Sequence, residues 1–451
     1  MKRTALLISF LIVFISSSPT LFSQNTQDEW KVGVARQNIT PQSPVWMAGY
    51  ASRTTPSEGK LHDIWAKAIT LEDAQGELSV LITTDLSAIP KELSVSFKDK
   101  VKQKHGLEKS QVILSCSHTH SGPVVTRSLK YIYPMNSNDW ENVDRYTIEL
   151  EEMLLQLVDE SIHNLIPAKI YTQNGTTRFQ VNRRNNQEST IINTTELKGP
   201  NDYSVPVIKA EDLDGNLIAI IFGYACHPTT LSINKFSGDY PGFAQIELEN
   251  LYPGTTAMFF QGAGGDQNPL PRRTIPLAIQ YGKELAAAVE RVLSEDMIKQ
   301  DSKLVTKYNE IELPFDEPLP MEEMKEISKR DDYQGKWAQG MIDDYQRDGY
   351  LIKSYPFPIG YWEIGNQKLF VLGGESTVFY SLKLKEIYGD EAFIMSYAND
   401  VMAYIPSEVI INEGGYEGDT SQRAFGLPAK WSKEIESLII EGIKKMVIQD
   451  N

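Results

Sequence analysis

The chain has 451 residues, of which 41% are apolar and 23% are charged. This is the composition of a folded globular protein and excludes an extended disordered chain. The formal net charge of −16 at pH 7 repels phosphate groups, so we expect no nucleic-acid partner. The length is sufficient for one large domain or two ordinary ones.

The N-terminus has the pattern of a secretory signal. Lys2 and Arg3 precede an apolar run, Ala5–Ile15, which is followed by small residues. That run is shorter than the roughly 18 apolar residues of a membrane-spanning helix. We therefore predict a signal peptide over residues 1–23 and a mature protein that is periplasmic or secreted. We expect no integral membrane segment after cleavage, because the most apolar later run, Leu217–Ala225, has only the length of a strand.

Strand-like and helix-like segments alternate along the rest of the chain. Short apolar runs predict β-strands at Trp30–Val34, Ala66–Leu71, Ser79–Thr84, Gln111–Ser115, Lys169–Thr172, Val205–Ala210, Leu217–Tyr224, Ala257–Gln261 and Lys368–Leu372. Longer runs predict helices at Lys91–Lys104, Asn142–Asn164, Pro276–Leu293 and Lys430–Val447. Asp214-Gly215 is a hairpin signal between two of the strands, so the sheets cannot be purely parallel. We predict an α/β fold of mixed β-sheets covered by helices.

Residues 316–355 differ from their surroundings because they are highly charged and begin with Pro318 and Pro320. We predict that their helix-like part, Met321–Arg347, forms a surface excursion or lid. The sequence has no internal repeat and no linker that divides it. We therefore predict a single large domain with insertions, over residues 27–449.

Two histidines follow a predicted strand directly. His118 and His120 come after the apolar residues Val112–Leu114, and Ser121-Gly122-Pro123 then forms a turn. Residues two apart on a strand point to the same face, so both imidazoles can converge on one point. At a strand end that opens into a loop, such a pair is either a binding or catalytic pair or a structural pair bonded to the backbone.

A third histidine, His227, has the same setting. The run Leu217–Ala225 leads into Cys226-His227-Pro228, where the proline ends the strand. Two strands that each end in histidine suggest a shared rim, although a buried structural histidine would give the same pattern. The two cysteines, Cys116 and Cys226, lie just before these histidines. Their apolar contexts favour two buried free thiols over a disulfide.

Zinc in a catalytic site takes nitrogen and oxygen ligands and keeps one position for water, so two histidines call for a carboxylate. Glu375 is the best placed, because the strand at Leu369–Leu372 leads through two glycines to Glu375 and then to a helix-like run, Val378–Ile387. Viewed alone, an acidic residue there is more readily explained as a helix cap. Asp266, in a glycine-rich loop, either orients a ligand or is a plain turn residue.

Motifs of several other hydrolases are missing. The His-x-His pair is followed by Ser121-Gly122-Pro123 rather than by the x-Asp-His of metallo-β-lactamases. There is no His-Glu-x-x-His helix of a zincin protease and no Gly-x-Ser-x-Gly elbow of a serine hydrolase.

The segment Ser117-His118-Thr119-His120-Ser121-Gly122-Pro123 resembles the signature of the neutral/alkaline non-lysosomal ceramidases. Further segments match this family in order: Val32–Pro41, Met47–Tyr50, Lys60–His62, Trp65–Ala68, Asn182–Arg184, Cys226–Thr229, Ser237–Asp239, Gly265-Asp266, Gly374–Thr377, Tyr404 and Tyr416–Gly418. The resemblance covers nearly all of the chain after the signal. It implies the fold of the family's N-terminal catalytic domain, in an exported bacterial homologue.

The resemblance also implies a site. It places the ligands of a zinc ion, Zn²⁺, at His118, His227, Glu375 and Tyr404. It places active-site positions at His120, Arg183, Tyr416 and Asp266.

Two departures from the family stand out. Family ceramidases carry a serine in a Gly-Asp-x-Ser-Pro pattern, whereas this chain has Asn268 at that place. The sequence also stops at Asn451, so we expect no C-terminal β-domain and fewer contacts for the acyl chains of a ceramide. We expect a ceramidase-like enzyme rather than a ceramidase.

We expect zinc-activated water to hydrolyse a non-peptide amide, in an N-acyl lipid or an N-acylated sugar, with His120 as general base and Tyr416 and Arg183 as oxyanion donors. The alternatives are a zinc-dependent ester or lactone hydrolase and a non-catalytic binding protein that retains the metal pocket. The partner is a small molecule, lipid or glycan. The sequence does not indicate an oligomeric state.

Overall fold

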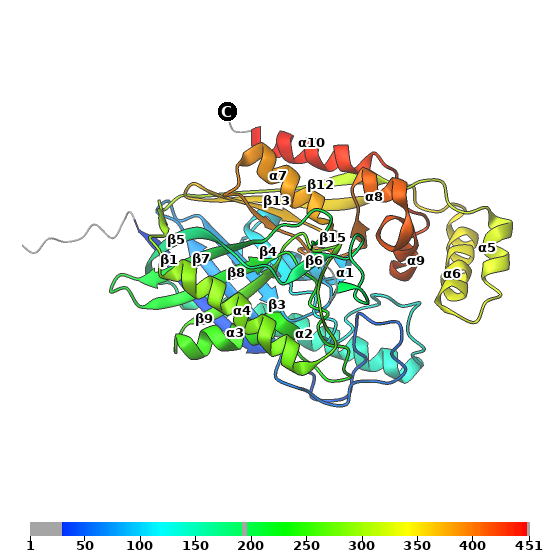
Figure 1. Ribbon diagram of the computed structural model, residues 1–451, viewed down its shortest axis with the longest axis horizontal. Helices are drawn as coiled ribbons and strands as arrows, with labels where there is room; N and C mark the ends of the chain where they lie inside the picture. The colour runs from blue at the N-terminus through cyan, green and yellow to red at the C-terminus, as the bar shows by residue number, and fades with distance from the viewer. Residues whose placement is uncertain (1–28, 192–195, 449–451) are drawn as a thin grey trace, which may run out of the picture.

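The computed structural model describes residues 29–191 and 196–448 (Figure 1). The predicted signal peptide, residues 1–23, and the outer limits of the predicted domain lie outside the described residues. Within these two ranges, no helix combines the length and the apolar character needed to cross a membrane.

The main sheet has nine strands in the order β4-β3-β2-β1-β5-β7-β8-β9, with β11 paired to β5. Its strands are β1 Trp30–Asn38, β2 Trp65–Glu72, β3 Leu78–Thr84, β4 Val112–Cys116, β5 Ile166–Thr176, β7 Ser204–Asp212, β8 Leu217–Tyr224, β9 Thr256–Gln261 and β11 Ile298–Gln300. Only β3–β4 and β8–β9 pair in parallel, and β7 and β8 form the hairpin predicted at Asp214-Gly215. The predicted mixed α/β fold is therefore confirmed.

The main sheet curls so that its two ends approach. Strands β4 and β9 stand at opposite ends of the strand order, yet they contact each other. The right-handed twist of neighbouring strands accumulates across a sheet in this way. The curl has a direct consequence for the site, because the loops that follow β4, β8 and β9 then meet at one edge.

Helices cover the outer face of the main sheet (Figure 1). They are α1 Lys91–His105, α2 Ser137–His163, α3 Asp239–Leu251 and α4 Ile275–Leu293. Because side chains alternate between the two faces of a strand, the main sheet separates an outer core from an inner core. In β2, Ala66 and Ala68 pack towards α1 and α2, whereas Ile69 and Leu71 belong to the core on the inner face. Helix α3, whose first turn carries Pro241 and Gly242, was not predicted.

A second, four-stranded sheet packs on the inner face of the first. Its order is β12-β13-β14-β16, with β12 Leu304–Pro314, β13 Ser354–Ile364, β14 Gln367–Leu372 and β16 Phe393–Met395. Its far face is covered by α7 Val378–Tyr388 and α10 Ile435–Ile448. Strands β12 and β13 were not predicted. Strand β12 is largely half-exposed and polar, and Pro356 and Pro358 in β13 argue against a central strand.

The charged segment 316–355 forms two helices instead of the single helix-like run that the sequence predicted. They are α5 Met321–Ile327 and α6 Tyr333–Asp348, and they project at one end of the molecule (Figure 1). The break falls at Asp332, whose carboxylate accepts from the backbone N–H groups of Gln334 and Gly335 and so caps α6. The two helices have a small core of their own around Met324 and Trp337.

The contact between β1 and the C-terminal end of α2 leaves no room for a side chain at Gly33. A Cβ atom there would lie 2.0 Å from the carbonyl oxygen of Ser161 and 2.8 Å from the backbone nitrogen of Leu165. We expect Gly33→Ala to lower the free energy of unfolding by about 1–3 kcal/mol, because overpacking forces the backbone to move. Urea unfolding measures this change. The control is Lys31→Ala on the same strand, which removes an exposed side chain and should change stability by about 1 kcal/mol or less. Equal effects of the two variants would contradict this packing argument.

Candidate metal centre and active site

The His-x-His pair lies beyond its strand rather than on it. Strand β4 ends at Cys116, and His118 has a backbone φ of 63°, in the left-handed region that non-glycine residues seldom adopt. The pair therefore does not have the strand geometry from which its convergence was predicted, yet the two imidazoles do converge. The Nε2 atoms of His118 and His120 lie 3.1 Å apart. Gly49 leaves room for the ring of His120, because a Cβ at that position would lie 2.4 Å from the imidazole.

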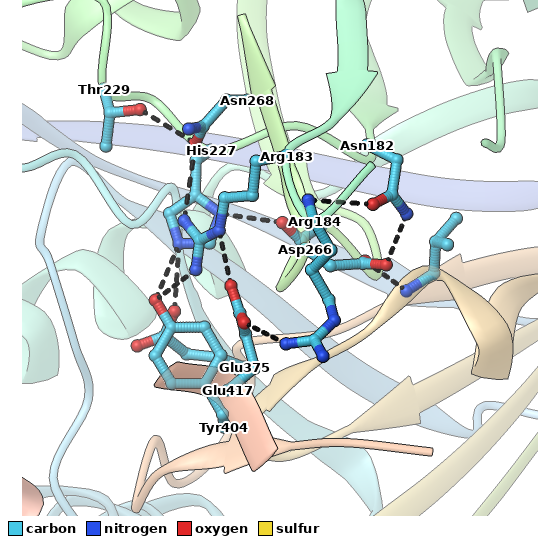
Figure 2. Close-up of polar contacts among 12 residues, drawn as sticks. Asn182, Arg183, Arg184, His227, Thr229, Asp266, Asn268, Glu375, Tyr404 and Glu417 are labelled. Atoms are coloured by element: carbon cyan, nitrogen blue, oxygen red, sulfur yellow. Dashed lines mark hydrogen bonds and ion pairs between the residues drawn. The ribbon is translucent and has the colours of Figure 1, made fainter. Parts of the chain in front are cut away.

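His227, Glu375 and Tyr404 reach the same point from other parts of the fold. His227 follows β8, whereas Glu375 and Tyr404 face each other on two short parallel strands, β15 Glu375–Ser376 and β17 Tyr404–Ile405. The Oε2 atom of Glu375 lies 3.2 Å from Nε2 of His118 and 3.1 Å from Nε2 of His227. The hydroxyl of Tyr404 lies 3.2 Å from Nε2 of His227 (Figure 2). All four predicted ligand side chains thus converge on one buried point.

Backbone carbonyl groups fix the orientation of two imidazoles. Nδ1 of His118 lies 2.5 Å from the carbonyl oxygen of Ser87, and Nδ1 of His227 lies 2.7 Å from that of Gly264. A carbonyl only accepts, so each Nδ1 carries the proton and each Nε2 presents a lone pair towards Glu375. This arrangement is typical of histidines that bind a metal. Ser87 and Gly264 carried no signal of this role in the sequence.

The donor set fits a cation. Within the described residues, His118, His120 and His227 offer nitrogen atoms that lie within 4.8 Å of one another. Burial raises the pKa of Glu375, but the positive charge and hydrogen bonds that His118 and His227 offer when their rings are protonated at Nε2 outweigh this effect and hold it well below its ordinary range. When the Nε2 atoms present lone pairs instead, a cation has to supply this positive charge. Two lone-pair nitrogens that each lie within 3.2 Å of one buried carboxylate oxygen are costly without a positive charge between them and that oxygen.

The electrostatics of Tyr404 are consistent with this requirement. Burial and the charge of Glu375 raise the pKa of its phenol well above the ordinary value, so the hydroxyl is neutral when no cation is present. A bound cation would lower the pKa of the phenol instead, because a metal ion favours the deprotonated form of its ligands. His120 is set apart from the other histidines, because its Nδ1 is buried without a hydrogen-bond partner among the described residues.

Arg183 links the centre to a neighbouring helical turn. Its Nη2 donates to the hydroxyl of Tyr404 at 3.1 Å, and its Nε donates to Glu417 at 2.7 Å. Burial opposes the charge, but Tyr404 and Glu417 together raise the pKa of Arg183 well above its ordinary value. Glu417 also accepts from Arg184 at 2.7 Å and so anchors the turn that carries Tyr416. No functional role for Glu417 was expected from the sequence.

Asp266 lies beside the centre rather than in it. Its carboxylate accepts from the side chain of Asn182 at 2.8 Å and from the backbone N–H of Val378 at 2.9 Å, while its carbonyl accepts from the N–H of Arg183 at 2.8 Å (Figure 2). The structure therefore does not support a catalytic role for this residue. Asp266 ties the start of α7 to the segment that carries Arg183, which is a positioning role.

Two hollows border the centre and share Tyr416. An inner cavity of about 110 Å³ is lined by ligand side chains together with apolar residues such as Leu129, Ile132 and Phe425, and by Tyr333 from α6. An outer basin of about 600 Å³ lies on the side of Arg183 and Asn268. Tyr416 as a whole residue is 50% exposed. Desolvation of its phenol group, together with the charge of Glu375, nevertheless raises the pKa of the phenol to about 12. It is thus a neutral hydrogen-bond donor at the mouth.

The two cysteines lie close in sequence to the ligand histidines His118 and His227. Cys116 and Cys226 are both buried and free, in agreement with the prediction that they do not pair. Burial raises the pKa of each thiol, so neither is a reactive thiolate.

Comparison with known proteins places the chain in a family. The family model for the N-terminal region of neutral/alkaline non-lysosomal ceramidases matches residues 30–270 of this sequence. Neutral ceramidase B of Dictyostelium discoideum is 26% identical over 304 residues, which are 60% of this chain and 41% of the relative. Neutral ceramidase of Pseudomonas aeruginosa is 24% identical over 278 residues, which are 59% of this chain and 40% of the relative.

The matched stretches thus span about two fifths of these curated relatives. The crystal structure of the Pseudomonas aeruginosa neutral ceramidase shares the fold, with a TM-score of 0.72 at 17% identity over 93% of this chain and 74% of that one. On the strength of the match to residues 30–270, the chain belongs to the neutral/alkaline non-lysosomal ceramidase family.

Proposed function

We propose that this protein is a zinc-dependent hydrolase that cleaves a non-peptide amide bond, as in an N-acyl lipid or an N-acylated sugar. The observation that carries the proposal is the convergence of His118, His227, Glu375 and Tyr404 beside a cavity that all of them except His227 line. The names of the relatives, which are neutral ceramidases, support an amide as the bond that is cleaved. We also propose export, on the basis of the predicted signal.

Zinc held by these four residues would polarise the carbonyl group of the substrate and lower the pKa of water towards about 7. The protein itself contributes a base. Burial and the neighbouring imidazoles lower the pKa of His120 well below its ordinary value, so the ring is neutral and able to accept a proton at Nε2. A histidine that can accept and then return this proton acts as general base and general acid.

Arg183 and Tyr416 would stabilise the negative charge that develops on the carbonyl oxygen. The guanidinium is held within 3.1 Å of the Tyr404 hydroxyl and stays protonated. The phenol of Tyr416, with a pKa of about 12, retains its hydrogen. Fixed donors of this kind stabilise a tetrahedral intermediate because they need not reorganise during the reaction.

Water, rather than a side chain, would attack the carbonyl. At the place of the family serine, Asn268 accepts from Arg183 and from Thr229, each at 3.4 Å. An amide side chain has no hydroxyl with which to form an acyl-enzyme. The reaction would therefore proceed by direct hydrolysis through a tetrahedral intermediate, without an acyl-enzyme.

Removal of one ligand tests the metal. We expect the wild-type protein to contain about one zinc per chain, and His118→Ala to lose most of it, because a catalytic site depends on each of its few protein ligands. Elemental analysis of the purified proteins measures the content. The matched control is His105→Ala, which removes a histidine whose ring is bonded to Asp159 on the helical surface and should keep the metal. A metal-free wild type whose stability does not change with chelator would favour a binding protein instead.

A matched substrate panel tests the bond that is cleaved. We expect amine release from N-acyl compounds to exceed alcohol release from O-acyl compounds of the same chain length. Arg183→Met should reduce both by about 100-fold or more, because one oxyanion donor is lost. If alcohol release were faster than amine release and were abolished by the same variant, the protein would be an ester or lactone hydrolase.

The absence of a serine nucleophile has its own test. Rapid-quench mass spectrometry of the enzyme with excess amide should show only unmodified protein throughout the first turnover. A covalent acyl adduct on any side chain would refute direct attack by water.

A further inference from the structure

The outer basin next to the centre concentrates positive charge in an acidic protein. Its lining includes the guanidinium groups of Arg183, Arg184 and Arg272 and two carboxylates, Glu188 and Glu417, and Arg184 also pairs with Glu413 at 2.8 Å. Arg273 follows Arg272 directly. Its guanidinium lies 5.6 Å from the ring centre of Tyr50, and it has no carboxylate partner among the described residues. The chain as a whole has a net charge of −16, so this local excess runs against the average surface.

The arginines differ in how many of their donors the protein already uses. Arg183 uses three donors, in bonds to Glu417 and Tyr404 and in a weak one to Asn268 at 3.4 Å, which leaves it two N–H groups. Arg272 uses only Nε, which donates to Glu188 at 2.9 Å, and Nη1, which donates to Thr229 at a weak 3.4 Å. A guanidinium has five N–H donors in a planar fork. Arg272 therefore keeps free donors at the wall of the basin, while 17% of its side chain is exposed.

We propose that the basin binds an acidic group on the amine portion of the substrate, a carboxylate or a phosphate, and that Arg272 is the positioning residue that recognises it. Free guanidinium donors match the oxygens of either group in a bidentate way. The apolar inner cavity would then take the acyl portion on the other side of the scissile bond. This inference rests on the proposed function and narrows its substrate to N-acyl compounds with an acidic head, in contrast to a neutral ceramide.

Binding measurements, which do not depend on turnover, test whether the basin recognises an acidic group. The probes are three octanesulfonamides, in which the sulfonyl group replaces the scissile carbonyl: those of glycine, of O-phosphoethanolamine and of ethanolamine. Their contacts with the metal centre and with the inner cavity are matched, so differences between them report the head group. Isothermal titration gives their dissociation constants for the metal-loaded full-length protein.

We expect at least one acidic probe to bind roughly tenfold more tightly than the ethanolamine probe, and Arg272→Gln to abolish that preference without weakening the neutral probe. Arg272→Lys should restore part of it. The control is Arg291→Gln, at an exposed ion pair on α4, which should change nothing. The tighter of the two acidic probes distinguishes a carboxylate from a phosphate head.

Equal affinity for all three probes in the wild type would overturn the inference, and so would a preference that survives in Arg272→Gln. The wild-type comparison stands even if a variant fails to fold. With the corresponding octanamides, Arg272→Gln should raise KM for the acidic substrate and leave kcat unchanged. Tight binding of an acidic probe without hydrolysis of any amide would contradict the proposed function while leaving the inference intact.

Discussion

The structure depends on one buried carboxylate. Glu375 is 2% exposed and lies within 3.2 Å of two imidazole nitrogens, and a charge in such a place is costly unless it is paired. Two backbone carbonyls orient the imidazoles of His118 and His227 so that their lone pairs face the carboxylate. A cation bound between these groups would compensate the buried negative charge.

The fold brings these groups together by curling a sheet. His118 and His227 follow strands that are far apart in the strand order, but the ends of the curled sheet are in contact. The second sheet then delivers Glu375 through β14 and a glycine turn, in which Gly374 has a φ of 62°. Asp266 and Glu417 act further out, each tying a segment that carries an active-site side chain to the rest of the protein. The candidate catalytic groups are thereby held on rigid elements, as a preorganised site requires.

Much of this arrangement could be predicted from the sequence, for identifiable reasons. Apolar runs fixed the main strands, and the position of His118, His227 and Glu375 after such runs pointed to a shared edge. The left-handed turn at His118 could not be predicted, because it results from contacts with residues distant in sequence. Tyr404 was expected only from the resemblance to a family, since a tyrosine after a short strand is ordinarily a core residue. The roles of Ser87 and Gly264 depend on backbone carbonyls, which carry no sequence signal.

The central claim is that a zinc ion sits between Glu375 and its neighbours, and anomalous diffraction at the zinc edge tests it most directly. Crystals of the protein purified without chelator should show one strong peak, about 2.0–2.2 Å from Nε2 of His118, Nε2 of His227 and the carboxylate of Glu375, with the Tyr404 oxygen also in contact. A peak coordinated elsewhere, or a well-ordered site with no peak in crystals grown with zinc, would contradict the account.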